Sequence, residues 1–264
     1  MGEKREGKKW LEAFSDPLAQ IYAFSSSITL ADLNGDGDHK LVIADLGTGK
    51  SKMMLKVYKG VTLFKENALV DLPTAVLTFF MDQEAPKVPV IGVASGPSVY
   101  IYKNLKPYYK FNVPSLPISE AEKEIWDQVR TEQLDLTTVA EFLESLSQQI
   151  TLAALTPRSQ KFLALRSVEE KREFVKNYTR EELKKPTTIT CMETLKKSSI
   201  DSNAIDCLVL GCESGGVYVV DGEALTVLRH LSLPSPPVFL HTSGLYDVEY
   251  RLLILCRNGC LYTI

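Results

Sequence analysis

Long apolar runs are missing from this sequence. None approaches the 18 or so residues that a membrane-spanning helix needs, and the first ten residues, MGEKREGKKW, contain no apolar core of a secretion signal. Myristoylation is not expected either, because Glu6 stands where the acceptor signal requires Ser or Thr. We therefore expect a chain that stays in the cytoplasm.

Residue types with characteristic site chemistry are also scarce. The histidines are His39, His230 and His241, and the cysteines are Cys191, Cys207, Cys212, Cys256 and Cys260. No histidine lies at a metal-ligand spacing or beside a G-x-S-x-G, and the cysteines form no C-x-x-C, so we expect buried free thiols. A net charge of −3 gives no indication of nucleic-acid binding. These absences favour a protein that is not an enzyme and has no cofactor.

What the sequence does contain is a repeat. Four segments share the order apolar run, Gly-containing turn, second run with Tyr: KLVIADLGTGKSKMMLKVYKG, VPVIGVASGPSVYIYKN, DCLVLGCESGGVYVVDG and YRLLILCRNGCLYTI. Each pattern predicts a β-hairpin. Tyr58 and Tyr102 are 44 residues apart, as are Tyr218 and Tyr262. That period is typical of β-propeller blades, so we predict an all-β propeller.

A helical insertion interrupts the repeat between the second and third segments. Tyr100 and Tyr218 are 118 residues apart, which leaves 118 − 44 = 74 residues beyond one blade. Capping boxes are predicted at Ser119 with Glu122 and at Ser167 with Glu170, and an N-cap at Thr156 before Pro157. Val139, Phe142, Leu143 and Leu146 form one apolar stripe that we assign to a core. The predicted organisation is blades 1 and 2 over residues 10–117, the insertion over 118–186, and blades 3 and 4 over 187–264.

The stretch from Asp32 resembles calcium loops. Asp32, Asn34 and Asp36, followed by a glycine, have the D-x-[DN]-x-D-G spacing. An EF-hand is excluded, because its twelfth position is Ile rather than Glu and its flanks are strand-like. The β-hairpin loop of FG-GAP propellers is closer in pattern, but its ninth position, which wants Asp, is Lys40. We favour a structural turn; if calcium binds, its ligands are Asp32, Asn34, Asp36 and Asp38.

A relaxed phosphate-binding pattern overlaps the same hairpin. Residues 44–51, ADLGTGKS, contain the G-K-S of a P-loop. A P-loop must open into a helix whose N-terminal amides hold the phosphate. The following residues, MMLKVYKG, alternate and are typical of a strand instead. A nucleotide-binding domain is therefore the least favoured hypothesis.

Several segments together identify a known family. In chain order they are LADLNGDGDHKLVIADLG, LKVYKG, ASGPSVYIYKNLKPYYKF, TLKK, CLVLG, SLPSPPVFL, and YDVEYRLL followed by CRNG. From about Lys9 to the last residue, the chain resembles the N-terminal propeller of the first Bardet-Biedl syndrome protein family, whose members are BBSome subunits. The resemblance implies a seven-bladed propeller with a helical insertion. About four blades are expected here, with the chain ending in the third strand of blade 4.

The resemblance also implies a function. Such a subunit is a non-catalytic part of a coat-like adaptor that sorts membrane proteins into and out of cilia. A GTP-bound Arf-like small GTPase recruits this adaptor to membranes by docking largely on the first and last blades. Implied partners are other BBSome subunits, the GTPase and membrane-protein cargo tails, with only indirect membrane contact. Implied locations are cytoplasm, cilium, ciliary membrane and basal body or centrosome.

Partner-contacting side chains are expected on the exposed loops of residues 10–65, in blade 1. Two classes of function thus remain open: an interaction module of a trafficking complex, which we favour, and a calcium- or nucleotide-dependent domain.

Overall fold

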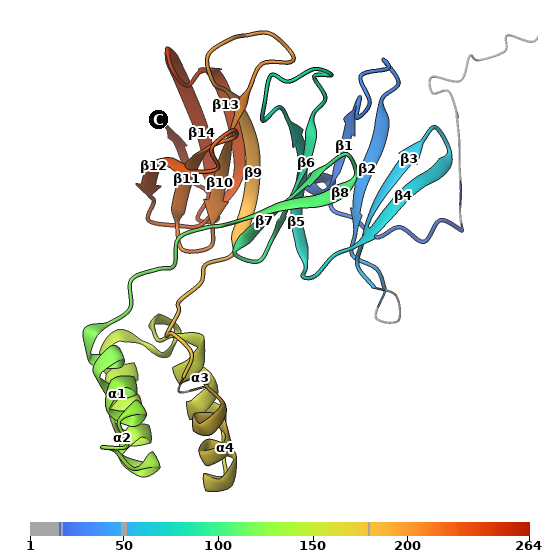
Figure 1. The fold of residues 1–264 in the computed structure, drawn as a ribbon. Coiled ribbons are helices and arrows are strands. Elements are labelled where there is room, and N and C mark those ends of the chain that lie inside the picture. Colours follow the sequence, from blue (N-terminus) through green and yellow to red (C-terminus); the bar gives the residue numbers. More distant parts are fainter. Residues whose placement is uncertain (1–15, 17, 49–51, 179) are drawn as a thin grey trace, which may run out of the picture. The chain divides into compact units, whose positions relative to one another are not determined.

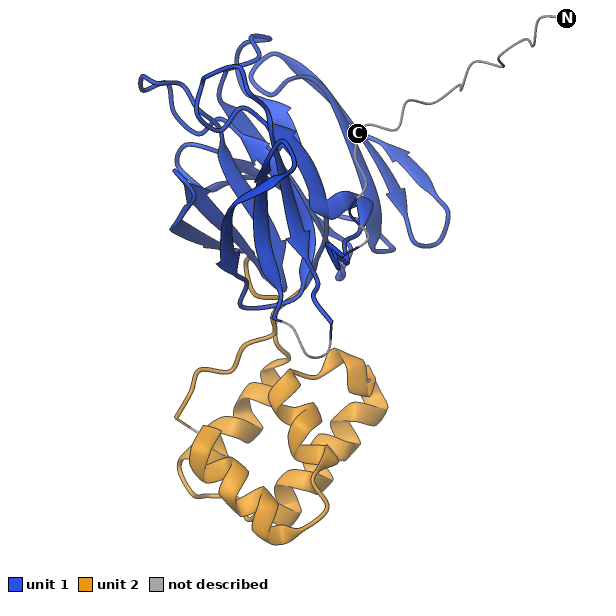
Figure 2. Cartoon of the chain, turned by 90° about the vertical axis from the view of Figure 1, so that its right-hand side faces the viewer, with its two compact units in different colours: residues 1–112, 188–264 blue, residues 113–187 orange. Residues whose placement is uncertain are grey.

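The computed structural model describes residues 16, 18–48, 52–178 and 180–264. The chain divides into two compact units (Figure 2): unit 1 comprises residues 1–112 and 188–264, and unit 2 comprises residues 113–187. Unit 1 holds the strands and unit 2 the four α-helices (Figure 1). Among the described residues, no helix is long and apolar enough to cross a membrane.

Unit 1 contains four antiparallel sheets whose strands follow one another in chain order. Blade 1 comprises β1 (Ile28–Ala31), β2 (Lys40–Asp45), β3 (Met54–Lys59) and β4 (Thr62–Ala68), after a short 3-10 helix, η1 (Ser25–Ser27). Blade 2 comprises β5 (Pro73–Phe79), β6 (Val90–Ser95), β7 (Ser98–Lys103) and β8 (Lys106–Asn112). Blade 3 comprises β9 (Ile189–Lys196), β10 (Asp206–Cys212), β11 (Gly216–Asp221) and β12 (Val227–Ser232). Blade 4 comprises β13 (Pro237–Leu245), β14 (Glu249–Cys256) and β15 (Leu261–Thr263).

The predicted hairpins are confirmed. The four repeated segments form the pairs β2–β3, β6–β7, β10–β11 and β14–β15. A further hairpin joins β7 to β8, where Asn104 and Leu105 both have positive φ, as two-residue hairpin turns of the favoured hand require. Gly215 has φ +85°, and a Cβ there would lie 2.3 Å from the carbonyl oxygen of Leu233. Only glycine fits at that turn.

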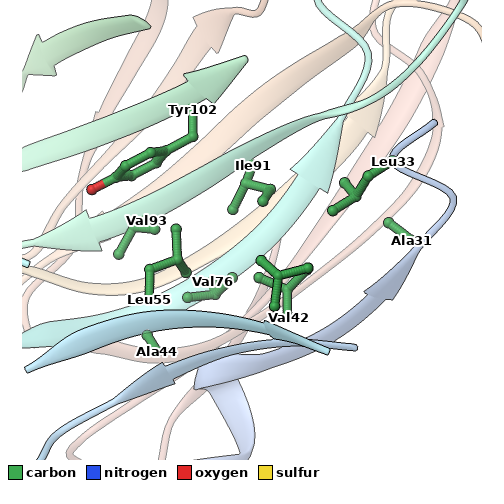
Figure 3. Packing of buried hydrophobic residues seen from close by; sticks show 10 residues of the cluster. Ala31, Leu33, Val42, Ala44, Leu55, Val76, Ile91, Val93 and Tyr102 are labelled. Atoms are coloured by element: carbon green, nitrogen blue, oxygen red, sulfur yellow. The ribbon is translucent and has the colours of Figure 1, made fainter. Parts of the chain in front are cut away.

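The core of unit 1 lies between the faces of neighbouring blades. Between blades 1 and 2, Val42 and Leu55 pack with Val76, Ile91 and Val93, all nearly inaccessible to water (Figure 3). Such a fully buried aliphatic side chain contributes about 1.5–3 kcal/mol of transfer free energy. The sheets are therefore stabilised by one another as well as by their own ladders.

A second cluster joins blades 3 and 4. Val209 and Val219 of blade 3 pack against Leu240, Leu252 and Ile254 of blade 4. Four cysteines are buried as free thiols, as predicted, whereas Cys260 is exposed. Burial raises the pKa of the Cys207 thiol to about 12, so this thiol is a packing group at neutral pH.

The outer face of blade 4 is apolar and exposed. Phe239, Leu255 and Leu261 stand opposite one another on β13, β14 and β15, with 59%, 37% and 64% of their surface accessible. Leu253, on the same face of β14, is 37% exposed. This face corresponds to the faces that neighbouring blades cover elsewhere in unit 1.

Unit 2 is a cluster of helices around its own core. The helices are α1 (Glu120–Arg130), α2 (Leu136–Ile150), α3 (Pro157–Ala164) and α4 (Val168–Tyr178), with a 3-10 turn, η2 (Leu152–Ala154). Val139, Leu143 and Leu146 of the predicted stripe are buried in that core. Phe142 is 47% exposed, so its assignment to the core was wrong. Leu136, Ala140 and Ile150 of α2 also pack against this core.

All three predicted helix starts are confirmed, because α1, α3 and α4 begin directly after Ser119, Thr156 and Ser167, and two of them have the predicted capping bonds. Thr156 accepts a hydrogen bond from the N–H of Ser159 and precedes Pro157 at the first turn of α3. Ser167 and Glu170 form the reciprocal pair of bonds of a capping box. The box at Ser119 was wrong, because that side chain makes no capping bond.

Glu122, the other half of the failed box, has a different partner. It is completely buried, and its Oε1 accepts hydrogen bonds from the backbone N–H of Thr156 at 2.9 Å and the Thr156 hydroxyl at 2.6 Å. Ser159 Oγ donates to the same oxygen at 2.5 Å and accepts from Trp126 Nε1 at 2.8 Å. Glu122 of α1 thus caps α3, and α1 and α3 are joined by this network.

We predict that Glu122→Gln lowers the free energy of unfolding of unit 2 by about 1–3 kcal/mol, because the amide presents donors to groups that are themselves donors. Urea unfolding followed by the fluorescence of Trp126 measures this change. Glu124→Gln, at an exposed position of the same helix, is the control and is expected to be neutral. Equal stability of the two variants would contradict the capping role.

Neighbouring residues of β14 give a second prediction. Leu255→Glu on the open face is expected to leave the fold intact, with a change in the free energy of unfolding within about 0.5 kcal/mol. Ile254→Glu places an unpaired charge between blades 3 and 4 and is expected to cost more than about 3 kcal/mol. Circular dichroism melts and size-exclusion chromatography distinguish them; the reverse ranking would show that the buried face of blade 4 is misassigned.

Candidate functional site

Asp32 organises the loop that joins β1 to β2. Its Oδ1 accepts hydrogen bonds from the N–H groups of Asn34, Gly35 and Asp36 at 3.3, 2.9 and 3.1 Å, and its Oδ2 accepts one from Gly37 at 2.7 Å. These bonds, that from Gly37 first, hold the pKa of Asp32 below its usual value. The carboxylate is therefore the acceptor for a tight turn of backbone amides.

The ammonium group of Lys40 lies inside the same loop. Its side chain is 0% exposed, and Nζ donates to Asp36 Oδ1 at 3.2 Å and to the carbonyl oxygen of Asp38 at 2.8 Å. The backbone N–H of Asp38 and then the hydrogen bond from Lys40 lower the pKa of Asp36 to about 2. An ion pair thus closes the turn.

The remaining carboxylate of the loop is also paired. Asp38 lies 3.3 Å from Lys59 Nζ in an exposed ion pair. The predicted calcium ligands Asp32, Asn34, Asp36 and Asp38 all lie in this loop, but its three carboxylates are bonded to backbone amides and lysines. Within the described ranges, no three His, Cys, Asp or Glu side chains are arranged to hold a metal ion. The donor set does not fit calcium, and the failure of the loop to bind calcium in solution stays a prediction.

The phosphate-like pattern is only partly described. Gly49, Lys50 and Ser51 lie outside the described residues, so no structural statement is made for them. The segment after them, Met54–Lys59, is strand β3, as predicted. Phosphate binding requires a helix start at this point, and the chain has a strand there instead.

Asp45, at the end of β2, connects three segments of blade 1. Its Oδ2 accepts a 2.6 Å hydrogen bond from Lys56 Nζ, and its Oδ1 accepts bonds from the N–H groups of Tyr22 and Gly47, each at 3.0 Å. Burial alone would raise the pKa of Asp45, but these bonds outweigh it and the pKa is lowered. Both carboxylate oxygens of Asp45 are therefore hydrogen-bonded within blade 1, and Asp45 does not supply the calcium ligand that is missing at position 40.

A hollow of about 430 Å³ in unit 1 lies over the first strands of blades 1 to 3. Its polar groups satisfy one another: Lys196 Nζ lies 3.0 Å from Asp206 Oδ1, while Asp206 Oδ2 accepts from the N–H of Phe80 at 2.9 Å. Burial raises the pKa of Asp206. His39 lines this hollow, whereas His230 stacks on Tyr218 in blade 3. These contacts join blades 2 and 3 and do not form a recognisable catalytic arrangement.

The exposed surface of blade 1 is where partner contacts were predicted. Among described residues of the 10–65 segment, Leu18, Leu30 and Val61 expose 83%, 63% and 60% of their surface. No partner is present to identify contacts, so this assignment stays a prediction.

Two functional groups of the fold were missed from the sequence. From the sequence, Lys40 was interpreted only as a missing metal ligand. Its basic side chain at a position that normally has a carboxylate is the signal that could have predicted an ion pair inside the loop. Glu122 was paired with the nearest hydroxyl in sequence, Ser119, because contacts across helices leave no periodic pattern.

We predict that Asp45→Asn lowers the free energy of unfolding at neutral pH by about 1–3 kcal/mol, since a charged hydrogen-bond acceptor is lost. Because the folded pKa of Asp45 is lowered, its contribution is complete above the unfolded value of 3.8 and is lost as pH falls through the folded pKa. The difference between wild type and variant should be constant from about pH 7 to 5 and shrink below about pH 4. Urea unfolding tests this; Glu66→Gln, at an exposed position of β4, is the control, and a difference that grows on acidification would contradict the assignment.

Comparison with known proteins gives consistent matches. The family model described as "Ciliary BBSome complex subunit 1" matches residues 10–264. The chain is 47% identical over 256 residues to "BBSome complex member BBS1" of Mus musculus and 46% identical to that of Homo sapiens. These matches cover 97% of the chain but 43% of each relative, so the chain spans less than half of their length.

Solved structures agree with these matches. A crystal structure of BBS1N in complex with ARL6DN, soaked with mercury, is 28% identical with a TM-score of 0.67, covering 97% of this chain and 58% of that one. A lead-soaked crystal of the complex is 27% identical with a TM-score of 0.68, covering 97% and 59%. The four sheets are thus part of a β-propeller with a helical insertion. The chain belongs to the BBS1 family, the family of ciliary BBSome complex subunit 1.

Proposed function

We propose that this chain is a non-catalytic scaffold subunit of the BBSome that binds a GTP-bound Arf-like small GTPase through its propeller. The observation that carries the proposal is the match over 97% of the chain to BBS1N, which was crystallised in complex with ARL6DN. Polar contacts of unit 1 support a scaffold role, because the loop at Asp32 is closed by its own hydrogen bonds and Lys196 pairs with Asp206 in the hollow over blades 1 to 3.

The finer parts of the proposal come from the family. The adaptor is coat-like, carries membrane proteins to and from cilia, and is recruited to membranes by the GTPase. Its partners are the other BBSome subunits and cargo tails, and it contacts the membrane only through them. Its locations are the cytoplasm, the cilium and its membrane, and the basal body region.

Affinity for the GTPase should depend on the number of blades present. Docking on the first and last blades of a complete ring would leave a four-bladed chain with only part of the contact surface. Interfaces that bury less than about 1,200 Å² in total are typical of weak encounters. The calcium-dependent and nucleotide-dependent alternatives gain no support from the loop, whose carboxylates are already paired.

We predict weak, GTP-dependent binding of the Arf-like GTPase by residues 1–264, and at least roughly tenfold tighter binding by a chain extended through the remaining blades of its relatives, a gain of about 1.4 kcal/mol. Biolayer interferometry with GTP- and GDP-loaded GTPase measures both. Val61→Ser tests the exposed loops of blade 1, with Val168→Ser in unit 2 as the matched control, since the two valines expose 60% and 52% of their surface. If residues 1–264 bind as tightly as the extended chain, the GTPase does not need both the first and the last blade. If binding is equal with GTP and GDP, the proposed function is wrong.

A further inference from the structure

The hairpin loop of blade 1 has the outline of a metal loop with one position changed. Asp32, Asn34 and Asp36 keep the metal spacing, and Lys40 occupies the position that should supply another carboxylate. Lys40 is one of the largest fully buried side chains among the described residues. A lysine is almost never completely buried unless its charge is paired.

The surroundings of Lys40 Nζ are those of a bound cation. The two carboxylate oxygens of Asp36, Oδ1 and Oδ2, lie at 3.2 and 3.5 Å, and the carbonyl oxygen of Asp38 lies at 2.8 Å. Carboxylate and carbonyl oxygens are the ligands that Ca²⁺ prefers, but at about 2.3–2.6 Å. The longer distances here are those of hydrogen bonds from an ammonium group.

We infer that the Lys40 ammonium group takes the place of the metal ion and makes this loop independent of calcium. Because the positive charge belongs to a side chain of β2, it cannot dissociate, and the loop needs no free calcium to stay closed. It also repels a divalent ion from the same oxygens. Asp32 contributes to the same closure, because its carboxylate holds the loop through four backbone N–H groups.

The inference makes opposite predictions for substitutions that differ only in what they place at position 40. Lys40→Asp and Lys40→Asn remove the internal cation and add an oxygen ligand, so both should melt at a lower temperature in EDTA and recover by several degrees in millimolar calcium. Lys40→Met removes the cation without adding a ligand and should be destabilised in both conditions. Wild type should melt identically with EDTA and with calcium.

A control at Lys59 distinguishes the effect of losing the buried cation at position 40 from the effect of changing the net charge near the loop. Lys59→Asp makes the same charge change beside the same loop, since Lys59 pairs with Asp38, but at a site where both partners are about half exposed. It should melt close to wild type and show no response to calcium. Terbium luminescence, used as a direct probe of the loop, should appear with Lys40→Asp and be absent from wild type, Lys40→Met and Lys59→Asp.

The decisive observation is recovery of Lys40→Asp or Lys40→Asn by calcium, without recovery of Lys40→Met or Lys59→Asp. Absence of calcium-dependent recovery in both oxygen-bearing variants, including a failure of both to fold at any calcium concentration, would overturn the inference. Micromolar calcium binding by the wild-type chain would overturn it as well.

Discussion

The burial of one blade face against the next is the constraint on which unit 1 depends. A four-stranded sheet of about six-residue strands has two faces, and its ladder hydrogen bonds leave the apolar face without cover. Val42 and Leu55 of blade 1 become inaccessible only because blade 2 supplies Val76 and Ile91. The outer face of blade 4, by contrast, has no such cover, and Phe239 and Leu261 are exposed there.

Buried polar contacts stabilise unit 1 both between blades and within them. Asp206 of blade 3 and Phe80 beyond β5 exchange backbone and side-chain hydrogen bonds, and Lys196 completes the pair. Asp45 does the same inside blade 1. Each of these buried carboxylates is satisfied by an ammonium group and by backbone N–H groups, as the cost of leaving it unpaired demands.

The sequence predicted the repeated elements well and the contacts between them poorly. A 44-residue period, alternating strands and glycine turns are local signals, so the hairpins and the helical insertion could be derived from them. Glu122 and Phe142 were misassigned because their environment is set by neighbouring helices, which periodicity does not contain. Lys40 was recognised as unfavourable for calcium, but its burial depends on the folded turn and could not be derived from spacing alone.

The central claim, that unit 1 is the docking scaffold for a GTP-bound Arf-like GTPase, is tested most directly by hydrogen–deuterium exchange of the chain with the GTPase added in its GTP and GDP forms. The account predicts protection that requires GTP, that falls on exposed loops of blade 1 and that leaves helices α1 to α4 unchanged. Protection confined to the helices, or equal in both nucleotide states, would contradict it.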